Sequence, residues 1–240
     1  MRRSLGKLAY NNLANGVSIL GVLPLCILFL KDDFQQYLIP LIVYNNIMDD
    51  LDGILATKLN IKSEFGALLD NVCDAFSHTL FVMLVMMRYA DIPAGANIVT
   101  MAIVLSGLTA AVAILLRVVS RLIPSSATGT GSPTNELVRH LLFVLLLLPD
   151  DYDFNARAVL VAMFTLHSVS IFVPIRMPYL IRSLTKSATA ISLVNVALVV
   201  AWLVPDTTLA IAACFVISYL YSFGWGCFKW LQQVQPKASE

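Results

Sequence analysis

Hydrophobic residues occur along this chain in long runs, and a short polar stretch separates each run from the next. The runs lie at about 13–30, 34–57, 66–88, 96–116, 136–149, 156–175, 188–204 and 207–228. Most of them are long enough for an α-helix to cross a membrane, which takes about 20 residues. The pattern therefore predicts an all-α protein, a polytopic transmembrane helix bundle with about eight spans. We treat residues 1–240 as a single transmembrane domain.

The composition agrees with a membrane location. Of the 240 residues, 58% are hydrophobic and 13% are charged, whereas a soluble domain carries about 25% charged residues. The formal net charge of +1 gives no indication of a nucleic-acid partner. The four cysteines, Cys26, Cys73, Cys214 and Cys227, form no C-x-x-C motif. We therefore expect neither a disulfide framework nor a zinc site.

Lysine and arginine residues are unevenly distributed between the two sides that eight spans create. With a cytoplasmic N-terminus, 13 of the 16 fall inside, and the other three, Lys31, Arg88 and Arg157, fall outside. This bias predicts that both termini are cytoplasmic, in the inner (plasma) membrane of a bacterium or its equivalent. Residues 1–12 mix basic and apolar side chains, which predicts an interfacial helix. Residues 229–240 are expected to form a cytoplasmic tail.

Two of the predicted spans contain carboxylates. Besides Asp50, these are the four residues Asp49, Asp52, Asp70 and Asp74. A charged residue near the bilayer centre costs about 2.5–3.5 kcal/mol on insertion scales, so four unpaired ones cost on the order of 10 kcal/mol. Hydrophobic burial gives no reason for these residues, whereas binding of a multivalent cation does.

The spacing of these residues places them on two helix faces. One face carries Asp49, Asp52, Gly53 and Ala56, and the other carries Gly66, Asp70 and Asp74. Residues at i, i+3, i+4 and i+7 share a helix face, so two such helices facing each other bring four carboxylates together. Hard oxygen ligands favour Mg²⁺, Mn²⁺ or Ca²⁺ over zinc. The small residues leave room for a ligand to approach the backbone.

At these positions the chain resembles the CDP-alcohol phosphotransferases. The motif of that family reads D-x-x-D-G-x-x-A-R-x8-G-x3-D-x3-D, and this chain matches it from Asp49 to Asp74 except at Thr57, where the family has Arg. The resemblance implies transfer of a phosphatidyl group from CDP-diacylglycerol, or of a phosphoalcohol from a CDP-alcohol, onto a hydroxyl with release of CMP. It also implies a two-metal site holding Mg²⁺ or Mn²⁺, partners among membrane lipids, and a homodimer.

The family motif also implies roles for individual residues. Asp49, Asp52 and Asp70 are implied as metal ligands, and Asp74 as a metal ligand and the general base. Nucleotide binding is implied for Gly53, Ala56 and Gly66. The sequence Asn15-Gly16-Val17-Ser18 resembles the N-x-x-T that opens the first span in the family, which extends the nucleotide-binding set to Asn15 and Ser18.

The departure at Thr57 removes a positive charge from the motif. Lys58 or Lys62 is a candidate to contact a phosphate instead, and the departure also leaves open an inactive homologue. Further candidates to bind a phosphate or the acceptor lie on the predicted cytoplasmic side, namely Arg117, Arg121 and Arg139.

The acceptor alcohol is less clearly indicated. The layout with eight spans resembles the branch of phosphatidylserine synthases and bacterial phosphatidylcholine synthases. Gly131-Ser132-Pro133-Thr134 and Val173–Tyr179 resemble segments of that branch. The cytoplasmic arginines favour L-serine, whose carboxylate needs a cation. Choline, which aromatic side chains bind, and a glycerol phosphate or inositol phosphate remain alternatives.

A function of another class is a membrane transporter whose aspartates bind a permeating cation, because acidic residues inside membranes often mark ion pathways. The small residues in register with the aspartates favour the transferase. Two neighbouring polar residues are interpreted as structural. Asp50 points about 100° away from Asp49 around the helix, and we expect it to cap the helix or pair with a lysine. His78 is expected to form a hydrogen bond within the bundle.

Overall fold

Within the described residues, every regular element of the chain is helical, which confirms the all-α class. The computed structural model describes residues 2–90, 97–122, 132–148, 155–172, 177 and 188–234. The first elements are α1 (Arg2–Asn11), α2 (Leu13–Val22), η1 (Leu23–Cys26), α3 (Ile27–Leu30), α4 (Gln35–Lys58) and α5 (Glu64–Ala90). They are followed by α6 (Ile98–Leu122), α7 (Ser132–Leu147), α8 (Ala156–Phe172), α10 (Ala188–Leu203), η3 (Pro205–Thr207) and α11 (Thr208–Val234).

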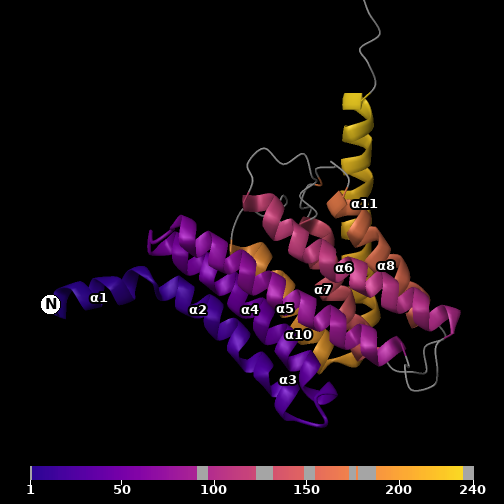
Figure 1. Cartoon of the computed structure of the whole chain (residues 1–240), viewed down its shortest axis with the longest axis horizontal. Coiled ribbons are helices and arrows are strands. Elements are labelled where there is room, and N and C mark those ends of the chain that lie inside the picture. The colour runs from indigo at the N-terminus through magenta and orange to yellow at the C-terminus, as the bar shows by residue number, and fades with distance from the viewer. Residues whose placement is uncertain are drawn as a thin grey trace, which may run out of the picture.

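The first predicted span is helical but not uniform. Its helix α2 gives way to the 3₁₀ turn η1, whose second residue is Pro24, before α3 continues to Leu30. Proline lacks the backbone N–H that an α-helix needs in its interior, which explains the change of helix type. The helix α1 projects away from the bundle, as Figure 1 shows at the N-terminus, and its location at the membrane interface remains a prediction.

Four helical segments of the described chain are long and apolar enough to cross a membrane. They are Leu13–Leu30, Glu64–Ala90, Ile98–Ser120 and Pro205–Gln233. Shorter apolar helices lie at Leu137–Leu147, Ala156–Phe172 and Ser192–Leu203. These lengths are consistent with an integral membrane protein. The count of eight spans, the cytoplasmic location of the termini, the identity of the membrane, the single-domain assignment and the homodimer remain predictions.

The helix α7 lies inside the bundle. It packs against α4, α5, α8, α10 and α11, while α5 packs on α6, α6 on α8, and α2 on both α4 and α5. Every residue from Leu137 to Leu146 is buried. Apolar side chains of α7 such as Phe143 therefore form the centre of the hydrophobic core, and any polar residue on this helix is enclosed by neighbouring helices.

The stretch from Arg117 to His140 is polar in sequence and rich in Gly, Ser and Pro at 124–134, which is typical of a loop, yet its described parts, residues 117–122 and 132–140, are helical. The helix α6 continues through Arg117 to Leu122, and α7 begins at Ser132, four residues before the predicted start of the fifth run at 136. Arg117 and Arg139 both form ion pairs inside the bundle. Because these ion pairs neutralise their charges, both arginines can lie on packed helices. The polarity of the sequence alone does not show this pairing. Residues 123–131, and with them most of the Gly, Ser and Pro-rich stretch, lie outside the described residues, as does most of the predicted segment 173–179.

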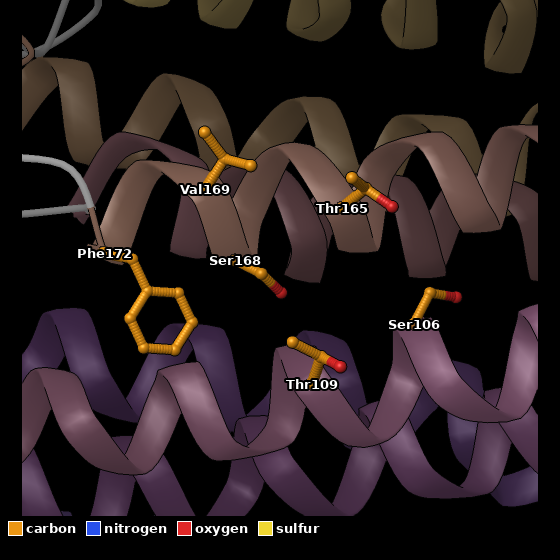
Figure 2. A pocket seen from close by; sticks show the side chains of 6 residues that line it. All are labelled: Ser106, Thr109, Thr165, Ser168, Val169 and Phe172. Atoms are coloured by element: carbon orange, nitrogen blue, oxygen red, sulfur yellow. The ribbon is translucent and has the colours of Figure 1, made fainter.

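Figure 2 shows a pocket of about 380 Å³ between α6 and α8. It is lined by Ser106, Thr109, Thr165, Ser168, Val169 and Phe172. Each of the four hydroxyl groups donates a hydrogen bond to a backbone carbonyl three or four residues earlier on its own helix. A backbone carbonyl of the same helix thus provides a hydrogen-bond acceptor for each hydroxyl in apolar surroundings. We therefore interpret these four hydroxyl groups as structural.

Candidate active site

A short turn brings the two halves of the aspartate motif together. Only residues 59–63 separate α4 from α5, and Asn60 adopts a left-handed backbone conformation with φ of 54°. Asparagine tolerates this conformation better than most residues do. The C-terminal half of α4, which carries Asp49 and Asp52, therefore lies near the N-terminal half of α5, which carries Asp70 and Asp74.

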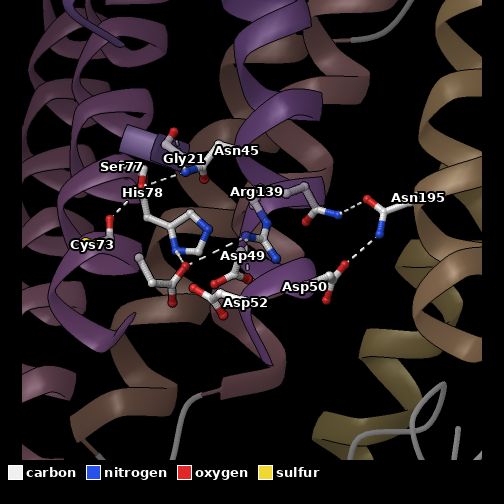
Figure 3. A network of polar contacts seen from close by, with 12 residues as sticks. Gly21, Asn45, Asp49, Asp50, Asp52, Cys73, Ser77, His78, Arg139 and Asn195 are labelled. Atoms are coloured by element: carbon white, nitrogen blue, oxygen red, sulfur yellow. Dashed lines mark hydrogen bonds and ion pairs between the residues drawn. The ribbon is translucent and has the colours of Figure 1, made fainter. Parts of the chain in front are cut away.

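Arg139 of α7 lies between the two halves. Its Nη1 atom is 3.3 Å from Oδ2 of Asp49 and 3.7 Å from Oδ1 of Asp74. The Arg139 side chain is 4% exposed, whereas those of Asp49 and Asp74 are 23% and 15% exposed. Figure 3 shows the guanidinium group directed at Asp49, with Asp52 and His78 beside them. One buried cation thus contacts a carboxylate from each of two helices.

Asp74 has two further partners. Nη1 of Arg117, from α6, is 3.3 Å from its Oδ2 atom, and Nδ1 of His78, one turn later on α5, is 3.2 Å from its Oδ1 atom. His78 is buried, and its Nδ1 atom lies at ion-pair distance from Asp74. The expected hydrogen bond of His78 within the bundle stays a prediction. Three helices therefore supply groups that orient the Asp74 carboxylate, and two of those groups are positively charged.

The other two aspartates have different surroundings. Asp52 is buried and accepts a hydrogen bond from the hydroxyl of Ser18 on α2. Asp70 is half-buried and lies one turn before Asp74 on α5. The structure thus places all four aspartates and Ser18 in one region, where the sequence pattern predicts them.

The glycines of the motif differ in the space around them. A Cβ atom added at Gly53 meets nothing within 4 Å, so one side of the Asp52 region is open. At Gly66, an added Cβ atom lies 2.8 Å from Oδ1 of Asn15 and 3.0 Å from Oγ of Ser63. Asn15 of α2 is therefore packed against the start of α5, beside the motif to which the sequence assigns it. Ala56 is half-buried on α4.

The predicted phosphate-binding residues fall into two groups. Arg117 and Arg139 contact the aspartates directly, as described above. Thr57, Lys58 and Lys62 are exposed, and the Thr57 hydroxyl donates a 2.8 Å hydrogen bond to the carbonyl of Gly53 on its own helix. Arg121 lies in the last turn of α6, and its side chain is outside the described residues.

Asp50 faces a different helix from its neighbour Asp49. It accepts a 2.6 Å hydrogen bond from Nδ2 of Asn195 on α10, and Oδ1 of Asn195 accepts one of 2.6 Å from Asn46 on α4. The amide of Asn195 is thus one partner of Asp50, and the expectation that Asp50 pairs with a lysine or caps a helix stays a prediction. Asn195 follows Asp50 by 145 residues, so no local sequence pattern links the two.

The donor atoms of this region fit divalent cations by their chemistry. Within the described part of the chain, no group of three or more His, Cys, Asp or Glu side chains is arranged to hold a metal ion as it stands. Arginines contact oxygens of Asp49 and Asp74, so these carboxylates already have cationic partners. If all are ionised, the four aspartates and two arginines carry a formal excess of two negative charges, which attracts a hard divalent cation.

The fold and this site define a helical membrane protein with paired carboxylates between adjacent helices. The chain belongs to the CDP-alcohol phosphatidyltransferase family, whose model matches residues 11–233. An uncharacterized protein of Aquifex aeolicus (strain VF5) is 34% identical over 86 residues, which cover 34% of this chain and 43% of that protein. The chain thus matches less than half the length of this relative.

Proposed function

We propose that this protein transfers a phosphatidyl group from CDP-diacylglycerol to the hydroxyl of L-serine and releases CMP. Membership of the CDP-alcohol phosphatidyltransferase family supports transfer from a CDP-linked donor to an alcohol. The branch that contains phosphatidylserine synthases is our choice among the alternatives. It rests on the charged side chains around the aspartates.

The observation that carries the choice of acceptor is the pair of arginines at the aspartate site. Arg117 and Arg139 are at most about one-tenth exposed, yet each carries a full positive charge. Guanidinium groups recognise carboxylates and phosphates through fixed hydrogen-bond geometry. Choline carries no acidic group and is bound by aromatic faces. Buried arginines therefore favour an acidic acceptor, and serine is the acceptor of that kind in the branch that the chain resembles.

The proposed reaction uses Asp74 as the general base. A carboxylate within reach of the acceptor hydroxyl accepts its proton while the hydroxyl oxygen forms a bond to the phosphorus of the phosphatidyl group. The bond from that phosphorus to the bridging oxygen breaks, and CMP leaves with that oxygen. His78 and Arg117 contact the two oxygens of Asp74 and hold the carboxylate in one orientation.

In this proposal Asp49, Asp52, Asp70 and Asp74 hold divalent ions, Mg²⁺ or Mn²⁺. Two such ions, when bound, neutralise charge on the phosphoryl group and position it for displacement. The open space beside Gly53 admits the nucleotide next to Asp52. Asn15 and Ser18, which lie on α2 against the same region, are further candidates to contact the nucleotide.

The direct test is release of CMP from CDP-diacylglycerol by the purified full-length protein in detergent, with Mn²⁺ or Mg²⁺ present. The acceptors compared are serine, choline, inositol, glycerol 3-phosphate and inositol phosphate. We expect release that depends on serine, and we expect Asp74→Asn to lower the rate by about 100-fold or more, as loss of a general base does. Asp50→Asn is the matched control, because Asp50 faces α10 and lies outside the proposed machinery.

Each other outcome has a defined meaning. Release that depends on choline or a sugar phosphate contradicts the assignment of serine and keeps the transferase. If the folded protein releases no CMP with any acceptor, the transferase proposal is wrong, and a cation transporter or an inactive homologue becomes the better interpretation.

A further inference from the structure

A hydrogen bond joins α4 and α5 about one helical turn from the aspartates. On α4, Asn45 precedes Asp49 by four residues, so the two side chains lie on the same helix face. On α5, Ser77 follows Asp74 by three residues and likewise shares its face. Nδ2 of Asn45 donates a 3.1 Å hydrogen bond to Oγ of Ser77 (Figure 3). This bond therefore links the two helices beside the carboxylates that they carry.

Asn45 also contacts the helix α2. Its Nδ2 atom, which carries two N–H groups, donates a second hydrogen bond of 3.4 Å to the backbone carbonyl of Gly21, near the end of α2. A Cβ atom added at Gly21 would lie 3.0 Å from Cβ of Met48, so α2 and α4 are in close contact here. Further along α4, Asp52 accepts a hydrogen bond from Ser18 of α2. The helix α2 is thus attached to α4 at two levels, and the aspartate motif begins between them.

The amide of Asn45 is held at a cost in stability. Both of its bonds require the nitrogen, because the Gly21 carbonyl only accepts and the Ser77 hydroxyl donates its proton at 2.6 Å to the carbonyl of Cys73. The Asn45 residue is 4% exposed, and its Oδ1 atom is buried without a hydrogen-bond partner among the described residues. An apolar side chain of similar volume avoids such an unsatisfied atom. The reason for asparagine therefore lies in the position that its bonds give to the three helices.

We propose that Asn45 is a positioning residue of the aspartate site. It fixes α2 and α5 against α4 and thereby sets the distance of the Asp49 and Asp52 carboxylates from that of Asp74. The inference rests on the part of the proposed function that gives these carboxylates divalent ions. Mg²⁺ requires near-ideal octahedral ligands at about 2.0–2.1 Å, whereas Ca²⁺ accepts a flexible set at about 2.3–2.6 Å. Rigidly placed ligands therefore favour Mg²⁺, and the bonds of Asn45 give the site its preference for the smaller ion.

The test measures binding of Mn²⁺ to the full chain in detergent without CDP-diacylglycerol, by electron paramagnetic resonance of the free ion. Mg²⁺ and Ca²⁺ are then titrated as competitors of Mn²⁺. Asn45→Leu keeps a similar volume and removes the amide. In this variant we expect Mn²⁺ and Mg²⁺ to bind about tenfold more weakly, as happens when a residue behind the metal ligands is lost. We expect Ca²⁺ to be affected less, and the melting temperature to stay close to that of the wild-type protein, because the unsatisfied oxygen is also removed.

Two further variants complete the test. Ser77→Ala removes the acceptor on α5, and we expect the same selective loss of Mg²⁺. The double variant with Asn45→Leu should bind no more weakly than Asn45→Leu alone, because both changes remove one bond. If Asn45→Leu lacks a cooperative thermal transition, Ser77→Ala decides by the same criteria. Thr100→Val is the matched control, because it removes a buried hydroxyl that bonds at 2.9 Å to the carbonyl of Ala90. That contact lies about 24 Å along α5 from Asp74, and we expect this control to bind all three ions as the wild-type protein does.

The inference is overturned if Asn45→Leu and Ser77→Ala bind the three ions as the wild-type protein does. Equal loss for Mg²⁺ and Ca²⁺, which a general loosening of the fold produces, overturns it as well. If the wild-type protein binds no Mn²⁺, or if Asp49→Asn does not weaken the binding, both the inference and the metal ions of the proposed function are wrong. Selective loss of Mg²⁺ in a protein that releases no CMP retains the inference and contradicts only the transferase. The two failures are therefore distinguished.

Discussion

Single residues decide how much room the site offers. Gly53 and Gly66 are both small residues of the motif, yet their surroundings differ. The space beside Gly53 is open, whereas Gly66 lies against Asn15 and Ser63. The N–H of Gly66 also donates to the Ser63 hydroxyl, which caps the start of α5. One glycine thus leaves space for a ligand, and the other permits close packing.

Gly53→Ala separates stability from substrate binding. Alanine is favoured over glycine in a helix interior by about 1 kcal/mol, and the added methyl group meets no neighbour. We therefore expect an unchanged or higher melting temperature in detergent. Because the nucleotide is proposed to approach this face, we expect the KM for CDP-diacylglycerol to rise. An unchanged KM would show that the donor binds elsewhere.

Gly66→Ala is the contrasting variant for this experiment. Its methyl group lies within 3.0 Å of side-chain oxygens from Asn15 and Ser63, so these side chains must move. We expect a melting temperature below that of Gly53→Ala, measured in the same detergent. Equal melting temperatures would mean that the Asn15 side chain moves aside without loss of stability. Packing would then give no reason for glycine at this position.

Among the helices, α4 has polar contacts on two sides. One face of its C-terminal half carries Asp49 and Asp52 toward α5 and α7, and another carries Asn46 and Asp50 toward α10. The groove between α4 and α10 beside this second face has a volume of about 410 Å³ and is mainly apolar. Hydrogen bonds in such apolar surroundings attach α10 to the helix that presents the aspartates.

Asn195→Leu tests the attachment of α10. The substitution keeps a similar volume and removes the 2.6 Å bonds to Asn46 and Asp50. Hydrogen bonds between membrane helices contribute about 0.6 kcal/mol on average, so we expect a loss of about 1 kcal/mol in the free energy of unfolding. Denaturant titration in detergent measures this quantity. Ser192→Ala, one turn earlier on α10, is the control and is expected to change the free energy of unfolding less.

For the whole molecule, the orientation in the membrane is a prediction from charge. With an even number of spans and a cytoplasmic N-terminus, the chain end beyond α11 is also cytoplasmic. We expect green fluorescent protein fused after the last residue to fluoresce in bacterial cells, and alkaline phosphatase fused there to be inactive. The opposite pair of results would place this end outside and would require an odd number of spans or an inverted bundle.

A fusion placed after residue 90 is the matched control. The sequence assigns the segment after α5 to the outer side, so phosphatase fused there is expected to be active. If both fusion sites are found on the same side of the membrane, the predicted alternation of inside and outside segments is wrong. The aspartates, which lie near the turn between α4 and α5, would then need another route of access for soluble substrates.

The sequence by itself determined the class of fold and the core of the candidate site. Apolar runs of sufficient length form helices in any apolar environment, because each backbone polar group is then satisfied within its own segment. The spacing of Asp49, Asp52, Asp70 and Asp74 is a local property of two helices that a five-residue turn connects. Their convergence therefore followed from periodicity and from the length of that turn.

Only the tertiary structure decided which residues meet these aspartates from elsewhere. Arg139 contacts Asp49 across 90 residues, and Asn195 contacts Asp50 across 145. Such pairs depend on how helices pack, which sequence periodicity does not specify. The same cause explains why Arg117 and Arg139 lie on helices although the sequence around them is polar. Their charges are paired inside the bundle, and pairing is a property of the packed structure.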